Sequence, residues 1–311
     1  MPNQEKRLDL LKVTGYHRRP AHLVAEKRGF FAKEGLEVVF EKATYAPDHN
    51  KGMAEGRWDF SLSSADTMIA RKTTDGTDYL LFMQAEEGLD ACLIARPGIA
   101  SMEELRGKLL AGDPGDSNLD LIRKKILHQH GIKDEEYSVE IIGASPQRFE
   151  AFKAGYVAAA MLTPPSSDAA LAIGGKILAR AADYFPNWPL TCGWTRRSWV
   201  ESHRDLVVRF IRAWVAATDW IMAPGNREET SELLMKEQGL SLTSAENSLQ
   251  RIVPKARINP LSIRRVLEIR IGMGFYSPPH APAERFYDAR YWCEATGLLA
   301  PEPAGTPSVS S

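Results

Sequence analysis

The sequence has few cysteines, and it lacks a long hydrophobic run. Its 311 residues include three cysteines, Cys92, Cys192 and Cys293, and their spacings match no metal-binding motif. An odd number of scattered cysteines also argues against a disulfide scaffold. No window reaches the roughly 18 consecutive apolar residues that a membrane-spanning helix needs. We therefore expect unpaired thiols and no membrane insertion.

Neither sign of charge is in excess. The chain has 39 Lys and Arg against 40 Asp and Glu, which gives a net charge of -1 at pH 7. A balanced chain has no electrostatic reason to bind nucleic acid or an anionic membrane surface. Zinc motifs, phosphate loops and the spacing of a nucleophile and its base are also absent from the sequence. We expect no metal, no cofactor and no nucleic-acid partner.

The amino terminus lacks the features of a secretory leader. The segment MPNQEKRLDLLKV has neither an apolar core nor a small-residue cleavage site. The sequence as it stands therefore predicts a cytoplasmic protein. Removal of a leader from in front of this sequence is the alternative, and it would make the protein periplasmic.

What the chain does contain is two similar series of strands and helices. Hydrophobic residues make up 44% and charged residues 25% of it, as in soluble globular proteins, and the length allows two cores. In the first series, Gly29, Gly35 and Gly56 mark the breaks between helices and strands. We expect strands over residues 8–15, 36–41 and 58–62, and helices over 20–28, 48–55 and 65–73.

The second series begins with a capping box, Ser101-Met-Glu-Glu104, in which a hydroxyl and a carboxylate each satisfy an amide of the first turn. Its strands are expected over 108–111, 139–142 and 157–162, and its helices over 119–130, 145–154 and 164–173. Crossovers between the two series are expected at 80–95 and 177–195.

The rest of the chain is predicted to be helical. Apolar residues recur at helical spacing after Asp205, and we expect helices over 205–223, 227–238, 244–252, 262–271 and 283–296. The tail is rich in proline and serine, which predicts disorder. The domains are then a first part of lobe 1 (1–90), lobe 2 (91–185), a return to lobe 1 with the carboxy-terminal helices (186–300) and a disordered tail (301–311).

Several segments together resemble one family. AEKRGFFAKEGLEV and MAEGRWDFSLSSADTMIA resemble the amino lobe of type II periplasmic binding proteins, and SMEELRGKLLAG, FEAFKAGYVAAAMLTPP and RFYDARYWCEATGLL resemble later parts. The nearest branch is that of sulfonate, taurine, nitrate and thiamine-precursor binding proteins. The resemblance implies an α/β fold with two doubly wound, Rossmann-like lobes, a two-strand hinge and a helical carboxy-terminal part. It also implies that the lobes close on a small ligand.

Candidate ligand contacts in the first lobe follow the first and third strands. The loop at 16–19 carries two guanidinium groups, which could hold an anion bidentately or face solvent. The loop at 63–66 opens a helix, so its hydroxyls could donate to an anion or only cap that helix. We select six residues: Tyr16, His17, Arg18, Arg19, Ser63 and Ser64.

In the second lobe, the loop GDPGDSN at 112–118 and the Pro164-Pro165 turn offer hydroxyl and amide groups. Asp113 and Asp116 weaken an anion site there, since carboxylates repel anions, and a solvated turn is the alternative. Aromatic rings near the second crossover could hold a flat ligand, although core packing would explain them as well. We select Ser117, Asn118, Thr163, Trp188 and Trp194.

Two functions fit these observations. The first is a solute-binding protein that captures a small anionic or aromatic ligand in an interlobe cleft, with delivery to an ABC permease as one role. The second is a cytoplasmic enzyme on the same scaffold, a lyase or decarboxylase acting on an aromatic or cyclic carboxylic acid. In that case His17, whose ring titrates near neutral pH, would transfer the proton.

Overall fold

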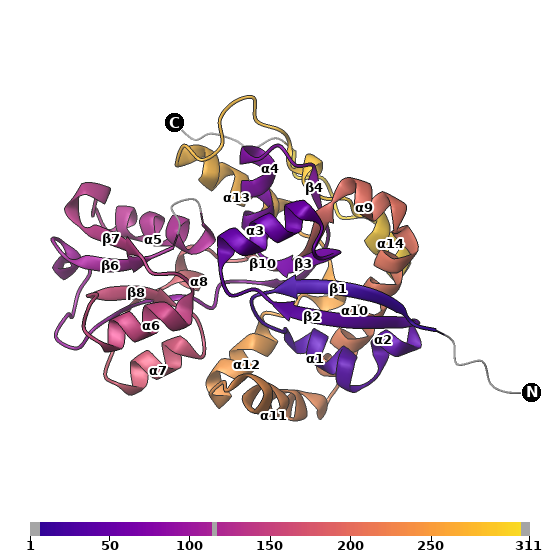
Figure 1. Cartoon of the computed structure of the whole chain (residues 1–311), viewed down its shortest axis with the longest axis horizontal. Helices are drawn as coiled ribbons and strands as arrows, with labels where there is room; N and C mark the ends of the chain where they lie inside the picture. The colour runs from indigo at the N-terminus through magenta and orange to yellow at the C-terminus, as the bar shows by residue number, and fades with distance from the viewer. Residues whose placement is uncertain (1–6, 114–116, 306–311) are drawn as a thin grey trace, which may run out of the picture. The chain divides into compact units, whose positions relative to one another are not determined.

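The computed structural model describes residues 7–113 and 117–305. The chain forms two compact units (Figure 1). Unit 1 extends to Glu87 and resumes over Pro189–Leu233 and from Leu249, whereas unit 2 comprises Gly88–Trp188 and Leu234–Ser248. None of the helices in the described parts of the chain combines the length and the apolar character that crossing a membrane requires.

Unit 1 is built on a five-stranded sheet in the order β2-β1-β3-β10-β4. Strands β1, β2 and β3 are mutually parallel, and β10 is antiparallel to both β3 and β4. Their bounds are β1 Asp9–Gly15, β2 Leu36–Lys42, β3 Phe60–Ser63, β4 Tyr79–Glu87 and β10 Pro189–Arg196. Helices lie on both faces of this sheet (Figure 1): α1 (Pro20–Lys27) and α2 (Phe30–Lys33) on one, α3 (Ala46–Glu55) and α4 (Ala65–Thr74) on the other.

Unit 2 repeats the arrangement with a sheet in the order β7-β6-β8-β5-β9. Here β6 pairs in parallel with β7 and β8, and β5 is antiparallel to β8 and β9. The strands are β5 Cys92–Ala95, β6 Leu109–Gly112, β7 Ser138–Ile141, β8 Ala159–Leu162 and β9 Lys176–Arg180. The helices are α5 Asn118–Gln129, α6 Ser145–Lys153, α7 Ser166–Ala172 and α8 Ala181–Tyr184, with short 3-10 helices η1 Glu103–Leu105 and η2 Asp134–Glu136.

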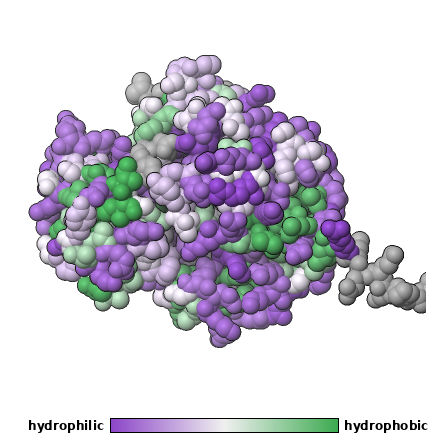
Figure 2. Space-filling model, viewed as in Figure 1, coloured by the Kyte–Doolittle hydropathy of each residue, from purple (hydrophilic) through white to green (hydrophobic). Residues whose placement is uncertain are grey.

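The remaining chain is mostly helical. Helix α10 (Arg204–Met222) buries an apolar face that includes Phe210, whose ring stacks on Phe31 of α2 at 5.4 Å between centroids. The other elements are α9 Arg197–Ser202, α11 Asn226–Gln238, α12 Leu242–Gln250, η3 Pro254–Ala256, α13 Pro260–Gly272, η4 Ala283–Arg285 and α14 Arg290–Thr296. Across the visible face, hydrophilic residues predominate, with hydrophobic patches on both units (Figure 2).

The strands and helices expected in the two repeated series occur, each within about two residues of the expected bounds. The helix expected over 283–296 is different, because it is interrupted between η4 and α14. The Leu81 amide donates to the Phe286 carbonyl and the Asp288 amide donates to the Leu81 carbonyl, both at 2.9 Å. These backbone groups bond to strand β4, so they are not available to a helix.

The capping box expected at Ser101 also forms differently. The Glu104 carboxylate accepts a hydrogen bond from the Ala100 amide at 3.1 Å, and the helix that follows is a single 3-10 turn.

One segment belongs to a different unit from the one expected. Leu234–Ser248 lies in unit 2 rather than with the return to lobe 1. In unit 2, Asp168 on α7 accepts hydrogen bonds from the hydroxyls of Ser241 at 2.8 Å and Ser244 at 2.9 Å.

Part of the tail that was expected to be disordered is held in place. The Ala304 carbonyl accepts a hydrogen bond from Arg264 at 2.7 Å, and the Gly305 amide donates to Glu284 at 2.8 Å. Residues 306–311 of the expected tail lie outside the described residues.

A buried ion pair joins two helices of unit 1. Asp66 in the first turn of α4 and Arg270 near the end of α13 are both fully buried. Nε of Arg270 lies 2.6 Å from Oδ1 of Asp66, and Nη2 lies 3.0 Å from Oδ2. This bidentate geometry compensates the cost of taking both charges out of water.

We predict that Arg270→Met destabilises the protein by about 3–5 kcal/mol, because it leaves the Asp66 carboxylate buried without its counterion. The control is Lys51→Met, which breaks the exposed pair between Lys51 and Glu55 on α3 and should cost at most about 1 kcal/mol. Urea unfolding monitored by circular dichroism measures both. An Arg270→Met variant no less stable than the control would contradict this role of the pair.

A histidine is buried in the same unit among aromatic rings. His22 on α1 is 1% exposed, and its ring meets the edges or faces of Phe31, Phe40 and Trp214 at centroid distances of 5.5, 5.1 and 6.3 Å. Its Nδ1 has no hydrogen-bond partner among the described residues. Burial, with a smaller contribution from the charge of Arg18, lowers the pKa of His22 from 6.5 to about 3. The ring is therefore neutral in the folded protein.

This burial predicts a loss of stability on acidification. Below pH 6.5 the unfolded chain binds a proton at His22, whereas the folded chain does so only near pH 3. The stabilisation present above pH 6.5 is therefore lost as the pH falls, by up to about 1.4 kcal/mol per pH unit. His22→Leu removes this titration. Between pH 7 and pH 5 the free energy of unfolding, measured by urea unfolding, should therefore fall by about 2 kcal/mol less in the variant than in wild type. Equal losses in variant and wild type would refute the prediction.

Candidate functional site

Each sheet has one place where the strand order reverses. In unit 1, β1 has β2 on one side and β3 on the other, and in unit 2, β6 lies between β7 and β8. In open α/β sheets, ligands bind at the carboxyl ends of the strands at such switch points. The residues that follow β1 and β3, and those that follow β6 and β8, are therefore the candidate site residues of the two units.

A chain of hydrogen bonds joins side chains near the carboxyl end of strand β3 in unit 1. The indole Nε1 of Trp194 donates to Oγ of Ser63 at 3.0 Å, Oγ of Ser63 lies 2.9 Å from Oγ of Ser61, and that atom lies 2.9 Å from Nε2 of His49. The other ring nitrogen of His49 lies 3.4 Å from Oδ1 of Asn50, which can only accept. In a neutral ring Nε2 is then the acceptor, so Ser63 donates to Ser61 and Ser61 donates to His49.

Aromatic rings enclose His49. The ring of Tyr16 lies 5.4 Å from it, Trp58 stacks on it at 6.0 Å and Trp194 meets it edge-on at 5.8 Å, measured between centroids. Burial is the main cause that lowers the pKa of His49 from 6.5 to about 4, opposed by Asn50 and by the charge of Asp48. The sequence analysis did not select His49, Ser61 or Trp58. Ser61 and Ser63 are two residues apart on one strand, so their side chains point to the same face. This spacing is the sequence signal that could have indicated Ser61.

Both arginines that were candidates to hold an anion have carboxylate partners. Arg18 lies 3.0 Å from Glu26, and both side chains are exposed. Arg19 pairs with Glu86 on β4, whose carboxylate is 2% exposed and also accepts a hydrogen bond from Thr191 at 2.9 Å. The charge of Arg19 therefore neutralises a buried carboxylate of its own unit. Whether either arginine also contacts a ligand stays a prediction.

The other candidates of unit 1 occupy different environments. Ser64 caps α4, since its hydroxyl accepts a hydrogen bond from the Asp66 amide at 3.2 Å, and it also lies 3.4 Å from the Pro189 carbonyl. Ser64 therefore caps the helix, which was one of the two alternatives for this loop. Its contact with a ligand stays a prediction. Tyr16 and His17 are half-buried on the loop after β1. Trp194 is fully buried.

Two of the candidates of unit 2, Ser117 and Thr163, are held by local hydrogen bonds. The hydroxyl of Ser117 caps α5 by accepting from the Asp120 amide at 3.3 Å. The Thr163 amide donates to Oγ of Ser145 at 2.9 Å. Oδ1 of Asn118 is buried and has no hydrogen-bond partner among the described residues, so it is an acceptor still open to a donor. Trp188 is 3% exposed and packs edge-on against Phe185 at 5.4 Å.

Charged side chains surround a narrow depression at the carboxyl end of β6. Asp113, Asp120, Arg123 and Arg148 are among the residues that line it. Nη1 of Arg148 lies 2.6 Å from Oδ1 of Asp113. The Asp113 carboxylate, which would repel an anion if it were unpaired, is thus neutralised within the unit. Asp116, the other acidic residue of this loop, lies outside the described residues.

Comparison with known proteins places this fold. Residues 20–227, which are more than half of the chain, match the family described as NMT1/THI5 like. A putative aliphatic sulfonates-binding protein of Bacillus subtilis (strain 168) is 29% identical over 244 residues, which cover 75% of this chain and 70% of that protein.

Solved structures agree with this assignment. The periplasmic nitrate-binding protein NrtA of Synechocystis PCC 6803 superposes with a TM-score of 0.77 at 15% identity, covering 93% of this chain and 89% of the other. The alkanesulfonate-binding protein SsuA of Xanthomonas axonopodis pv. citri gives 0.72 at 14% identity, covering 86% and 94%. These likenesses concern the fold. The chain belongs to the NMT1/THI5-like family, and its fold is that of the type II periplasmic binding proteins.

Proposed function

We propose that the protein is a solute-binding protein for a small anionic or aromatic molecule, with organic sulfonates as the first class to test. The family assignment and the sulfonate-binding name of the Bacillus subtilis relative support this proposal. In this role the protein would deliver its ligand to an ABC importer and would work outside the cytoplasmic membrane, where such an importer takes up its solute.

One observation disfavours a catalytic role for the histidine of unit 1 that the hydrogen-bonded hydroxyls reach. The hydroxyls at the edge of unit 1 end in His49, whose pKa burial lowers to about 4. A general base works best when its pKa is near the operating pH, so His49 is a weak base for activating Ser61 at neutral pH. The same neutral groups are suitable for holding the contact loops in place, because hydrogen bonds and packing fix them before a ligand arrives.

The proposed contacts divide into direct and supporting ones. In unit 1, Tyr16, His17 and Ser64 are proposed to touch the ligand, while Arg19, Ser63 and Trp194 hold the loops in place through the bonds described above. In unit 2, Ser117, Asn118 and Thr163 are proposed contacts. Asn118 has the clearest reason, since its buried Oδ1 has no hydrogen-bond partner within residues 7–113 and 117–305.

The proposal is tested by titrating the purified protein with methanesulfonate, taurine, MOPS, nitrate and an aminopyrimidine in a calorimeter. We predict that at least one of them binds and raises the free energy of unfolding by about 2.7 kcal/mol at a concentration one hundred times its Kd. Tyr16→Phe removes a hydroxyl proposed to donate to the anion and should weaken binding by about tenfold.

The matched control is Tyr156→Phe. Tyr156 is a 55% exposed tyrosine of unit 2, and its hydroxyl donates to Glu140, so its loss should leave binding unchanged. Chromatography of the titrated samples checks for products. The proposed function is wrong if none of these compounds binds, or if a carboxylic acid is turned over and His17→Ala abolishes the turnover without changing binding.

A further inference from the structure

The charged residues at the carboxyl end of β6 have no role yet in the proposed function. Arg123 on α5 and Arg148 on α6 are each 1% exposed. They line the same narrow depression as Asp113 and Asp120. Buried arginines are retained only when their charge is compensated, and here each has one carboxylate partner.

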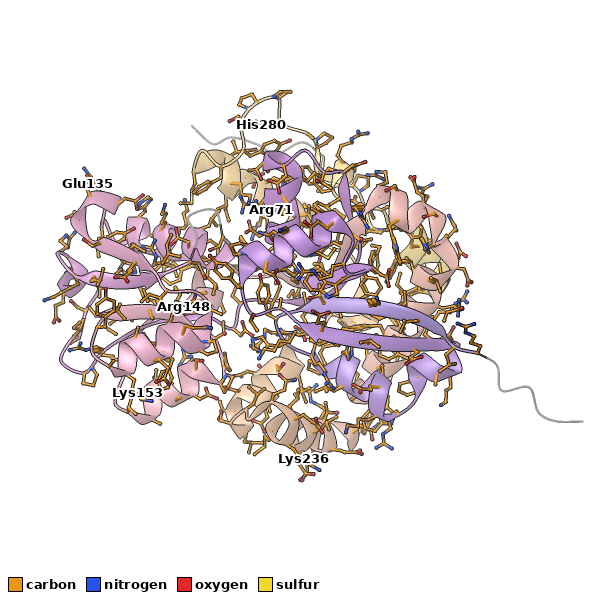
Figure 3. All side chains as sticks on the ribbon, viewed as in Figure 1. Arg71, Glu135, Arg148, Lys153, Lys236 and His280 are labelled. Atoms are coloured by element: carbon orange, nitrogen blue, oxygen red, sulfur yellow. The ribbon has the colours of Figure 1, made fainter. Side chains whose placement is uncertain are left out.

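Arg148 is fixed by the backbone. Its Nε donates to the Met161 carbonyl at 2.9 Å, and its Nη1 donates to the Gly143 carbonyl and to Oδ1 of Asp113. Figure 3 shows its place on α6, the helix that also carries Lys153. Its partner Asp113 belongs to the loop after β6 and is more exposed, 14% against 2% for the side chains. The carboxylate is therefore the movable member of this pair.

The depression is also lined by a second buried guanidinium group, that of Arg123. Arg123 directs Nε at Oδ1 of Asp120 at 3.2 Å, and its guanidinium lies 5.1 Å from the ring centre of Tyr137. Its Nη1 is buried and has no hydrogen-bond partner among the described residues. A buried guanidinium nitrogen without an acceptor is costly, so an acceptor brought by a ligand would gain free energy here.

We propose that Asp113 is an internal counterion, and that the anionic group of a ligand displaces it from Arg148. This inference rests on the proposed function and names the ligand class of the site in unit 2, an oxyanion such as a sulfonate. The ligand's oxygens take the place of Oδ1 on Nη1 of Arg148 and supply an acceptor to Nη1 of Arg123. The released carboxylate turns to solvent, so the buried charge stays compensated throughout.

The exchange predicts how binding depends on pH. Burial raises the pKa of Asp113, and the charge of Arg148 opposes that rise. The other charged groups facing Asp113 are Asp120 and Arg123 of α5, and Lys124 lies 3.6 Å from Asp120. A protonated Asp113 binds Arg148 less strongly, so the affinity for an anion should increase as the pH falls toward the pKa of Asp113.

The test is Asp113→Asn, which keeps the shape of the side chain and removes its charge. We expect the variant to bind methanesulfonate about tenfold more tightly than wild type at pH 7.5. Its affinity should also lose the pH dependence between pH 7.5 and 5. The control is Glu150→Gln, which removes one negative charge from the exposed pair with Lys153 on α6 and should behave as wild type.

The outcomes separate this inference from the proposed function. If wild type binds methanesulfonate but Asp113→Asn binds it no more tightly, the inference is wrong and the function stands. If neither protein binds an organic sulfonate, the proposed function is wrong for that class. Inorganic sulfate then decides the inference: greater thermal stabilisation of Asp113→Asn than of wild type and Glu150→Gln supports it, and equal stabilisation overturns it.

Discussion

Charge neutralisation within each unit is the constraint on which the candidate sites depend. A charged side chain taken out of water costs several kcal/mol unless a partner compensates it. Unit 1 pairs Arg19 with Glu86, and unit 2 pairs Asp113 with Arg148. Each pair joins a residue on the loop after a switch-point strand, β1 in unit 1 and β6 in unit 2, to a residue on another element. The loops at the switch points are therefore held in place by the same bonds that make the buried charges tolerable.

Because the buried charges are paired with one another, the remaining polar groups at the carboxyl ends of the strands are neutral donors and acceptors. In unit 1, the groups along the edge are an indole N–H, two hydroxyls and a histidine that burial keeps uncharged. The ring of His49 is fixed by packing against Tyr16 and Trp58. A ligand that binds on loops supported by these groups does not have to reorganise charges in the core, which keeps the cost of binding low.

The sequence was a good guide to the fold and a partial guide to the site, for different physical reasons. Glycines and hydrophobic periods are local signals: Gly56, for example, ends α3 with a φ of 75°, in the left-handed region that favours glycine. The partner of Arg19 is not local, since Glu86 lies 67 residues further along the chain. His49 was missed for the same reason, because only the folded chain brings it to Ser61.

The two units also differ in how they could compensate the charge of a ligand. In unit 1 the carboxylate that pairs with Arg19 is 2% exposed and bonded to Thr191, so its exchange for a ligand would disturb the core. In unit 2 the carboxylate that pairs with Arg148 lies on a loop and is more exposed. A site whose charges stay paired recognises the shape and the hydrogen-bonding groups of a ligand. A site with a movable counterion recognises the charge of the ligand. Unit 1 would then recognise the shape of the ligand and unit 2 its charge. Substitutions in one unit could change the specificity for shape without changing the specificity for charge.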